Sequence, residues 1–500
     1  MDWKKLLSDE HDGEYYIEPD VAQQYQRSGF EKEYHYIISS PSFRRLQDKT
    51  QVFPLDNSDF VRTRLTHSIE TSSLARTLGS MVTYFMLDVD EYNNKIKFAD
   101  IRALDAAIIK RDITNILMCA GLLHDIGNPP FGHFGETAIQ DWFKENLATF
   151  KYKDKTVETV LSANPQALQD LYHFEGNAQA LRLLTKLHFQ NDNQGLHLTY
   201  ALLNTLIKYP TSSENVEGKQ AKKISKKKMG FFQSENDIFQ RITEVTGTGC
   251  NRHPLTFLLE AADDIAYATA DLEDAFKKGL IGFEQVVDVF ETFKFGDEVD
   301  KSAKEKTNEL LKSLKTLKED AIKQGNENPE MYAIRNWIPE VQFWFLYSAS
   351  YAFTYNYSEI ISGNYEKELL TDGYHKYTTK ILKKLMNTFV YPSSAIEKLE
   401  IAAHSIITGL LQKFVKAIIY YDTSFEDEVL KEHPEWQMRG VDEKLVRLIS
   451  DNYINNYHAE ASNKSEEEKL YLRLLLVTDF ICGMSDSYAK SLYQELEGIY

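Results

Sequence analysis

The chain contains 500 residues, of which 43% are hydrophobic and 26% are charged, so it has ample material for a large buried core. Its formal net charge of −18 argues against general binding to nucleic acid, because such binding needs a basic surface that neutralises phosphates. The three cysteines, Cys119, Cys250 and Cys482, are far apart, which argues against a disulfide framework or a thiolate zinc site and favours the cytoplasm.

Helical patterning dominates the chain. Apolar residues recur at helical spacing in nearly every long segment, whereas the alternating runs typical of strands are scarce. The sequence therefore predicts an all-α protein in which residues 1–500 form a single large helical domain. We expect no signal peptide and no membrane insertion, because the first residues are charged and the late apolar segment is interrupted by Arg473 and Asp479.

The first candidate functional residues lie in the helical stretch RTRLTHSIE, residues 62–70. Arg64 precedes His67 by three residues, so the two side chains lie on the same helical face. A guanidinium in that place can hold a phosphate with two hydrogen bonds. We therefore interpret Arg64 as a candidate phosphate contact and His67 as a candidate metal ligand.

The strongest local signal is GLLHDIGNPPFGHFGE, residues 121–136, in which His124 and Asp125 end an apolar helix before a Gly/Pro-rich turn. Neighbouring helical residues diverge by about 100°, so this pair needs further ligands from elsewhere to bind one ion. His67 upstream and Asp263 downstream are the candidates, and Asp264 competes with Asp263. Two imidazoles and two carboxylates suit Mg, Mn, Fe, Co or Ni and leave positions open for water and phosphate.

The same segment contains a second pair, His133 and Glu136, three residues apart. At helical spacing the carboxylate can orient the imidazole, and a histidine that titrates near neutrality is a plausible proton donor. The alternative is a capping pair at a helix start, and spacing alone does not decide between the two.

Two charged stretches follow. The lysine-rich run KQAKKISKKKMG, residues 219–230, is interpreted as a solvated, mobile loop, with a basic contact for nucleic acid as the alternative. The stretch KSAKEKTNELLKSLKTLKED, which begins at residue 301, has apolar residues at roughly helical spacing and predicts an exposed helix.

The ordered constellation of H, then HD, then D is the arrangement of the HD phosphohydrolases. Beyond that signature, segments spread in order over about residues 30 to 490 resemble the bacterial deoxyguanosinetriphosphate triphosphohydrolases. They include SPSFRRLQDKTQVFPL, GLLHDIGNPPFGHFGE, HFEGNAQALRLL, RHPLTFLLEAADDIAYATADLEDA and VTDFICGMSDSYA. One departure is visible, because the family usually has an Arg-Asp-rich stretch before its SxxFRRL motif, where this chain reads EKEYHYIISSPSF.

The resemblance implies a helical HD core with helical N- and C-terminal elaborations. Residues 60–275 would form the HD catalytic region, and residues 276–500 would complete the pocket and supply oligomer contacts. The implied metal ligands are His67, His124, Asp125 and Asp263. Asp263 is preferred over Asp264 because the family pattern places a tyrosine four residues and an aspartate eight residues after the ligand, here Tyr267 and Asp271.

The resemblance also implies residue roles around the metal. His133 and Glu136 would be the catalytic pair. Tyr267 would pack against the deoxyribose and exclude a 2′-hydroxyl, and Asp271 would accept a hydrogen bond from the 3′-hydroxyl. The remaining implied substrate contacts are Gln51 at the sugar or base edge and Arg64, His173 and Lys208 near the phosphates.

The implied activity is metal-dependent hydrolysis of dGTP to deoxyguanosine and triphosphate, and base selectivity among dNTPs is left open. A cytoplasmic homo-oligomer, hexamer or tetramer, is expected, and single-stranded DNA or a nucleotide is a candidate effector. The alternatives are a broad-specificity dNTPase, an HD nucleotidase or phosphodiesterase, and a nucleic-acid-binding protein with a vestigial HD site that uses residues 219–228.

Overall fold

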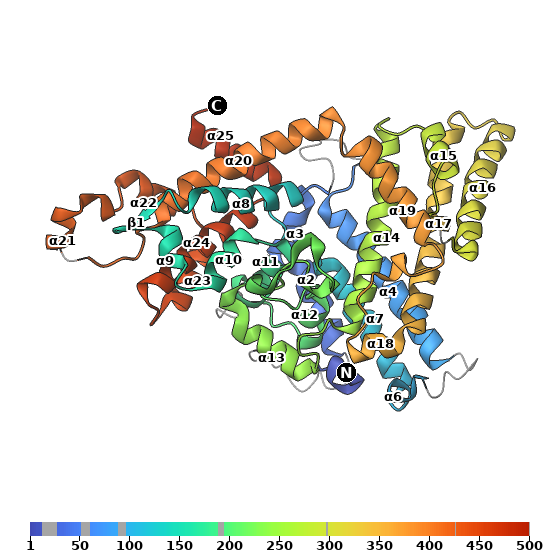
Figure 1. The fold of residues 1–500 in the computed structure, drawn as a ribbon, viewed down its shortest axis with the longest axis horizontal. Coiled ribbons are helices and arrows are strands. Elements are labelled where there is room, and N and C mark those ends of the chain that lie inside the picture. Colours follow the sequence, from blue (N-terminus) through green and yellow to red (C-terminus); the bar gives the residue numbers. More distant parts are fainter. Residues whose placement is uncertain are drawn as a thin grey trace.

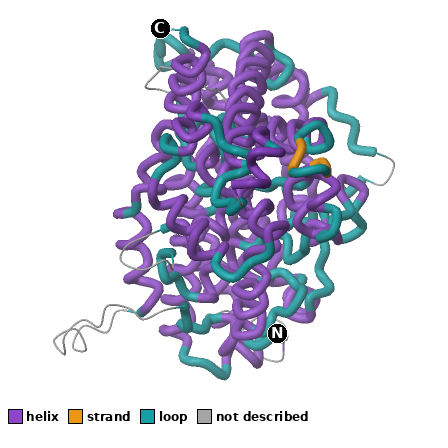
Figure 2. The backbone as a smooth tube through the Cα atoms, turned by 90° about the vertical axis from the view of Figure 1, so that its left-hand side faces the viewer, coloured by secondary structure: helices purple, strands orange, loops and turns teal. Residues whose placement is uncertain are grey.

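The computed structural model describes residues 1–12, 28–51, 61–88, 97–188, 195–296, 299–425 and 427–499. The protein is 71% helical, with 24 α-helices and two short strands in the described ranges, which confirms the predicted all-α class. Figures 1 and 2 show helices throughout the molecule, with the small antiparallel pair of β1 (Lys151–Tyr152) and β2 (Lys155–Thr156) at one side.

The first half of the chain forms the helices around the candidate site. They are α1 (Trp3–Leu6), α2 (Gly29–Ser39), α3 (Pro41–Arg45), α4 (Arg64–Leu87), α6 (Ala99–Arg102), α7 (Ala106–Leu123), α8 (His133–Asn146), α9 (Val157–Leu161), α10 (Pro165–Tyr172), α11 (Gly176–Arg182), α12 (Tyr200–Leu206), α13 (Asn236–Thr246) and α14 (Pro254–Lys277). Local signals set their ends: Thr63 caps α4, Asp105 caps α7, and Pro254 occupies the first turn of α14.

The second half of the chain supplies the remaining helices. They are α15 (Phe283–Glu291), α16 (Lys301–Lys323), α17 (Pro329–Tyr355), α18 (Tyr357–Ser362), α19 (Lys376–Leu385), α20 (Ser394–Ile418), α21 (Asp427–Glu432), α22 (Gly440–Val446), α23 (Asp451–Ala461), α24 (Glu466–Cys482) and α25 (Asp486–Glu497). α16 confirms the helix predicted near residue 301. In Figure 1, α15 to α17 lie beyond α14 on one side of the molecule, and α20 runs over α8 on the other.

The core is continuous across both halves. Buried hydrophobic residues from Trp3 to Leu492 form one cluster, and α4 packs along both α7 and α14. Residues 396–418 in α20 are long and apolar enough to cross a membrane by length and composition alone, and half of the most apolar window is buried inside the fold. The three cysteines are free. The proposed division into residues 60–275 and 276–500 stays a prediction.

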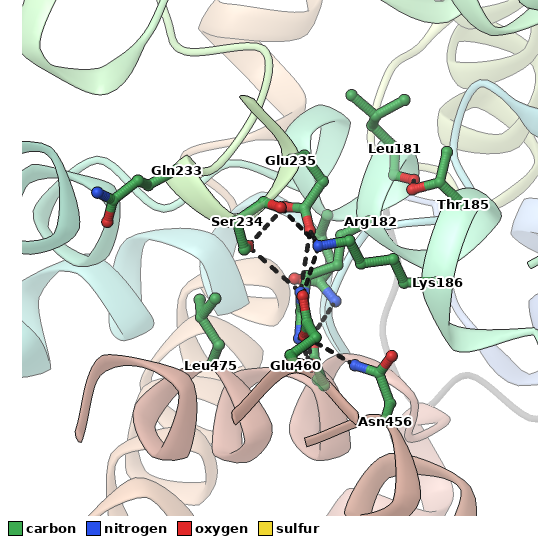
Figure 3. A network of polar contacts seen from close by, with 12 residues as sticks. Leu181, Arg182, Thr185, Lys186, Gln233, Ser234, Glu235, Asn456, Glu460 and Leu475 are labelled. Carbon is green, nitrogen blue, oxygen red and sulfur yellow. Dashed lines mark hydrogen bonds and ion pairs between the residues drawn. The ribbon is translucent and has the colours of Figure 1, made fainter. Parts of the chain in front are cut away.

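A buried polar cluster attaches the C-terminal helices to the first half of the chain. Arg182, at the end of α11, donates hydrogen bonds of 2.8 to 3.0 Å to Asp479 of α24 and of 2.9 Å to Glu235 and Glu460. Figure 3 shows the side chains of Glu235, Glu460 and Lys186 converging on Arg182. Because a buried guanidinium needs its carboxylate partners, this cluster fixes α23 and α24 against α11.

Glu33 of α2 is a buried carboxyl whose ionisation opposes folding. It is fully buried, accepts a hydrogen bond from the Thr199 N–H with Oε1, and has no partner for Oε2. Burial outweighs that hydrogen bond and raises the pKa of Glu33 from 4.5 to about 7. Between these two pH values the folded protein holds a proton that the unfolded chain has released, so stability falls as the pH rises through this window.

We therefore expect Glu33→Gln, whose amide oxygen can still accept from Thr199, to gain stability relative to the unmodified protein as the pH rises from about 5 to about 8. Urea denaturation at several pH values measures the difference. Glu145→Gln, on the exposed side of α8, serves as the control without a trend. A Glu33→Gln difference that stays constant with pH would contradict the assignment.

Candidate active site

Three helices bring the four predicted metal ligands together. His67 lies in the first turn of α4, His124 and Asp125 follow the last turn of α7, and Asp263 lies in the middle of α14. One ligand atom each from His67, His124 and Asp125 can be chosen so that all lie within 4.8 Å of one another. Oδ1 of Asp263 lies 3.1 Å from Nε2 of His67 and 3.2 Å from Nε2 of His124.

The close approach of α4 and α7 makes this convergence possible. A Cβ atom at Gly121 would lie 2.5 Å from Cα of Ser72, so only glycine lets the two helices meet there. Ser72 also donates a 2.7 Å hydrogen bond to the carbonyl oxygen of Met118. The ring centroids of His67 and His124 are consequently 5.2 Å apart.

The donor set fits a divalent metal ion. Nδ1 of His124 donates to the carbonyl oxygen of Gly121 at 2.9 Å, which leaves the lone pair of Nε2 directed at the centre. That Nε2 is buried and lies 3.2 Å from Oδ1 of Asp263, another predicted ligand, without forming a hydrogen bond of good geometry. Asn128 donates a 2.7 Å hydrogen bond to Oδ1 of Asp125 and so orients this carboxylate. Two imidazoles and two carboxylates form a mixed nitrogen and oxygen site.

Asp264, the competing residue, points elsewhere. Its Oδ2 lies 3.8 Å from Nζ of Lys383 in α19, and burial raises its pKa to about 7. Asp263 behaves in the opposite way. Burial alone would raise the pKa of Asp263, but Lys208 and the two histidines outweigh it and hold this pKa well below the usual range. The geometry thus favours Asp263 as the fourth ligand.

Each ligand carboxylate is paired with a cation. Arg64 is buried and donates from Nη1 to Oδ2 of Asp125, and Nζ of Lys208 lies 3.1 Å from Oδ2 of Asp263. Two of the three residues predicted to lie near the phosphates, Arg64 and Lys208, are therefore at the centre. Nε of Arg64 is buried without a hydrogen bond, so this guanidinium has capacity for a further acceptor.

His133 and Glu136 form the predicted pair at the start of α8. Nδ1 of His133 donates to Oε2 of Glu136 at 2.8 Å, and Oε1 of Glu136 accepts from the Gly176 N–H at 2.8 Å. The side chain of His133 is 78% exposed, while that of Glu136 is only 5% exposed. The buried carboxylate therefore holds Nδ1 of the imidazole and leaves Nε2 available to a ligand. The hydrogen bond and charge of Glu136 raise the pKa of His133.

A strained turn places His133 next to Arg64. Phe131 and Gly132 both adopt positive φ angles, 64° and 58°. The positive φ angle of Gly132 favours glycine, and a Cβ atom there would lie 2.2 Å from Nη2 of Arg64, so a larger residue would displace this guanidinium. The backbone that precedes α8 therefore touches the guanidinium that contacts the metal centre.

The prediction that the lysine-rich run, residues 219–230, is a solvated loop is wrong for the end of the run. Its first lysines, such as Lys219 and Lys222, are exposed as expected, but the end of the run is not a solvated loop. Nζ of Lys228 lies 2.6 Å from Oε2 of Glu175 and 3.9 Å from Oε2 of Glu136, and Met229 is buried. The carboxylates of Glu175 and of Glu136, a member of the predicted catalytic pair, thus draw Lys228 into the fold.

Tyr267 and Asp271, the predicted sugar contacts, lie farther along α14, and both form a hydrogen bond with Tyr391. The hydroxyl of Tyr267 makes a short hydrogen bond with that of Tyr391, which in turn donates to Oδ2 of Asp271 at 3.5 Å. Asp271 is buried, and burial raises its pKa well above the usual value. Tyr391 follows η9 (Met386–Val390), a π-helical turn after α19.

Of the two remaining predicted substrate contacts, Gln51 lies beside the site, whereas His173 makes no described contact with it. Gln51 is half-buried, its Oε1 lacks a hydrogen bond, and the preceding Thr50 pairs with Thr63 immediately before α4, so Gln51 flanks the site. His173 ends α10, and among the described residues no hydrogen bond or ion pair joins it to the metal centre. Its role near the phosphates stays a prediction.

Sequence reasoning missed four residues that the structure adds to the site. Asn128 stands three residues after Asp125 in the same motif, and that spacing could have indicated it. Lys228 and Tyr391 have no local signal, because their partners are distant in the sequence. Asp486 lies within VTDFICGMSDSYA and contacts the turn before His133.

Comparisons with known proteins agree with this geometry. The sequence model of the HD domain family matches residues 64–194. With the helical fold and the centre of His67, His124 and Asp125, this match defines the class as HD-domain proteins, a helical fold associated with metal-dependent hydrolysis.

Similarity extends over the whole chain. It is 45% identical over 500 residues to the deoxyguanosinetriphosphate triphosphohydrolase-like protein of Listeria monocytogenes and 34% identical over 510 residues to that of Synechocystis, with full coverage of each chain. It is 31% identical over 514 residues to the deoxyguanosinetriphosphate triphosphohydrolase of Yersinia enterocolitica, with 93% of each chain covered. The chain therefore belongs to the deoxyguanosinetriphosphate triphosphohydrolase family.

Proposed function

We propose that this protein is a metal-dependent dNTP triphosphohydrolase that converts dGTP and water to deoxyguanosine and triphosphate. The observation that carries the proposal is the His67, His124, Asp125 and Asp263 centre beside an exposed imidazole, that of His133, held by a buried carboxylate. The names of the relatives support the substrate class.

A divalent ion in this centre would polarise a phosphate and lower the pKa of an attacking water. Arg64 and Lys208 neutralise the two ligand carboxylates here. In the loaded site those carboxylates have another counter-ion, so both cations can turn toward phosphate oxygens and hold the triphosphate. Lys228, close to Glu136, adds a third cation on the side of His133.

His133 would act as the proton donor. Glu136 raises the pKa of His133 and so favours the protonated imidazole, and the hydrogen bond to Glu136 leaves Nε2 free to protonate the departing O5′ oxygen. Glu136 is the positioning residue of this pair, because its second oxygen is anchored by the Gly176 N–H.

Tyr267 and Asp271 would receive the sugar. The hydroxyl of Tyr391 contacts that of Tyr267 and donates to Asp271, the carboxylate that would accept from the 3′-hydroxyl. We therefore propose that Tyr391 turns away when deoxyribose enters and that Tyr267 then lies under C2′. This arrangement supports deoxyribonucleotides as substrates, because a 2′-hydroxyl would meet the tyrosine ring.

The alternatives are weaker. The full-length similarity to deoxyguanosinetriphosphate triphosphohydrolases and the two cations beside the ligand carboxylates favour a triphosphohydrolase over an HD nucleotidase or phosphodiesterase. The nucleic-acid-binding alternative relied on residues 219–228, and Lys228 is paired with Glu175 inside the fold. The cytoplasmic location, the hexamer or tetramer, and effector binding by single-stranded DNA or a nucleotide stay predictions.

Turnover of the four dNTPs and GTP, each with Mg, Mn and Co, tests the proposal. Phosphorus NMR distinguishes triphosphate from pyrophosphate, and chromatography identifies the nucleoside. We expect deoxynucleoside and intact triphosphate, with GTP a poor substrate. Release of dNMP and pyrophosphate, or equal turnover of GTP and dGTP, would contradict the proposed reaction or the role of Tyr267 respectively.

A further inference from the structure

The first residue of α25 reaches the turn that carries His133. Asp486 is 1% exposed, and its Oδ1 accepts a 2.9 Å hydrogen bond from the Phe131 N–H. Its Oδ2 accepts from both the N–H of Thr50, at 3.0 Å, and the hydroxyl of Thr50. One carboxylate from the C-terminal end of the chain thus joins two segments that lie 355 and 436 residues earlier.

Both segments flank the reacting groups. Phe131 adopts a left-handed backbone that is unfavourable for a residue with a side chain, so this conformation needs outside support. It lies two residues before His133. On the other side, the carbonyl oxygen of Lys49 accepts from the Arg64 N–H at 2.8 Å, and Thr50 pairs with Thr63, so residues 49–50 set the start of α4.

A second link reinforces the first. Nζ of Lys49 is buried and donates to the carbonyl oxygens of Asn128, at 2.6 Å, and Cys482, at 2.7 Å. Asn128 in turn orients Asp125. The end of α24 and the start of α25 are therefore connected by hydrogen bonds to the turn before His133, and through residues 49–50 to the backbone N–H of Arg64. Through Lys49 and Asn128 they are also connected to Asp125.

We propose that Asp486 is a positioning residue of the active site, which holds Phe131 and Thr50 with one carboxylate and so fixes His133 relative to Arg64. The catalytic part of this inference rests on the proposed function. A carboxylate is required, because three donors converge on its two oxygens and an amide would turn an N–H group toward one of them.

The test uses the full chain with Asp486→Asn, an isosteric change. We expect the bound metal to be retained, kcat to fall about 10- to 100-fold and KM to change by less than about threefold, because misplacement affects the transition state. Hydrogen exchange should accelerate in peptides that cover residues 129–135 and 47–51 and stay unchanged in α20. The matched control is Ser487→Ala, which removes a 2.9 Å hydrogen bond from the same helical turn to Asp48 and should leave kcat unchanged.

If Asp486→Asn does not fold, Thr50→Val provides a milder variant, because it removes only the hydroxyl that donates to Asp486. We expect this variant to lose kcat several-fold. A loss of activity in Asp486→Asn that merely follows the loss of folded protein, or a Thr50→Val variant with unchanged kcat, would overturn the inference. If the unmodified protein does not hydrolyse dNTPs, the proposed function fails, and hydrogen exchange still decides whether Asp486 holds the turn.

Discussion

Asp263→Ala is expected to lose bound metal and activity together, whereas Asp264→Ala retains both to a large extent. Asp263 contacts both histidines of the centre, while Asp264 faces Lys383. Loss of an outer partner typically weakens metal binding by about 10- to 100-fold, so loss of a direct ligand should cost more. Metal content by mass spectrometry and metal affinity by calorimetry measure the difference.

The two aspartates are matched neighbours, so each variant controls for the general effect of a mutation in the middle of α14. Alanine at His67, His124 or Asp125 should resemble Asp263→Ala. The opposite ranking, with metal lost from Asp264→Ala and kept by Asp263→Ala, would show that the fourth ligand is assigned wrongly.

His133→Ala is expected to bind metal and dNTP normally and to turn over about 10²- to 10⁴-fold more slowly, as is typical for loss of a general acid. The imidazole is exposed and contacts Glu136, and no contact among the described residues joins it to the metal ligands directly. Metal content, binding of a non-hydrolysable analogue and kcat separate these effects. A variant that loses its metal would make His133 a ligand instead.

The pH dependence of kcat tests the roles of His133 and Glu136, because it predicts the direction in which each variant shifts the pH profile. A general acid must be protonated, so kcat should fall as the pH rises through the pKa of His133. Glu136 raises this pKa and Lys228 lowers it. Glu136→Gln should therefore shift the fall to lower pH, and Lys228→Met should shift it to higher pH. Shifts in the same direction would contradict the proposed arrangement.

The sequence predicted the helical class, which the structure confirms, and it predicted a set of metal ligands that the structure brings close together. His124 and Asp125 lie in one short motif, and the resemblance to the family pattern implied Asp263, Tyr267 and Asp271 as a set. Helical periodicity adds only that residues at offsets of four and eight lie near one face of a helix. The structure then places the predicted ligands as neighbours, which spacing alone could not ensure.

Contacts between segments that are far apart in the chain could not be predicted from the sequence. Lys228 belongs to a run whose composition indicates solvent, and only the fold brings Glu175 and Glu136 to it. Tyr391 and Asp486 meet their partners across 120 and 355 residues. No periodicity or motif encodes such a pairing, because it depends on how helices pack in three dimensions.

Hydrolysis of dGTP in ¹⁸O-labelled water tests the central claim most directly. A water activated at the His67, His124, Asp125 and Asp263 centre should attack phosphorus while His133 protonates the ester oxygen. The label should therefore appear in triphosphate and be absent from the 5′-hydroxyl of deoxyguanosine. Label in the nucleoside would mean attack at carbon and would contradict the mechanism assigned to this site.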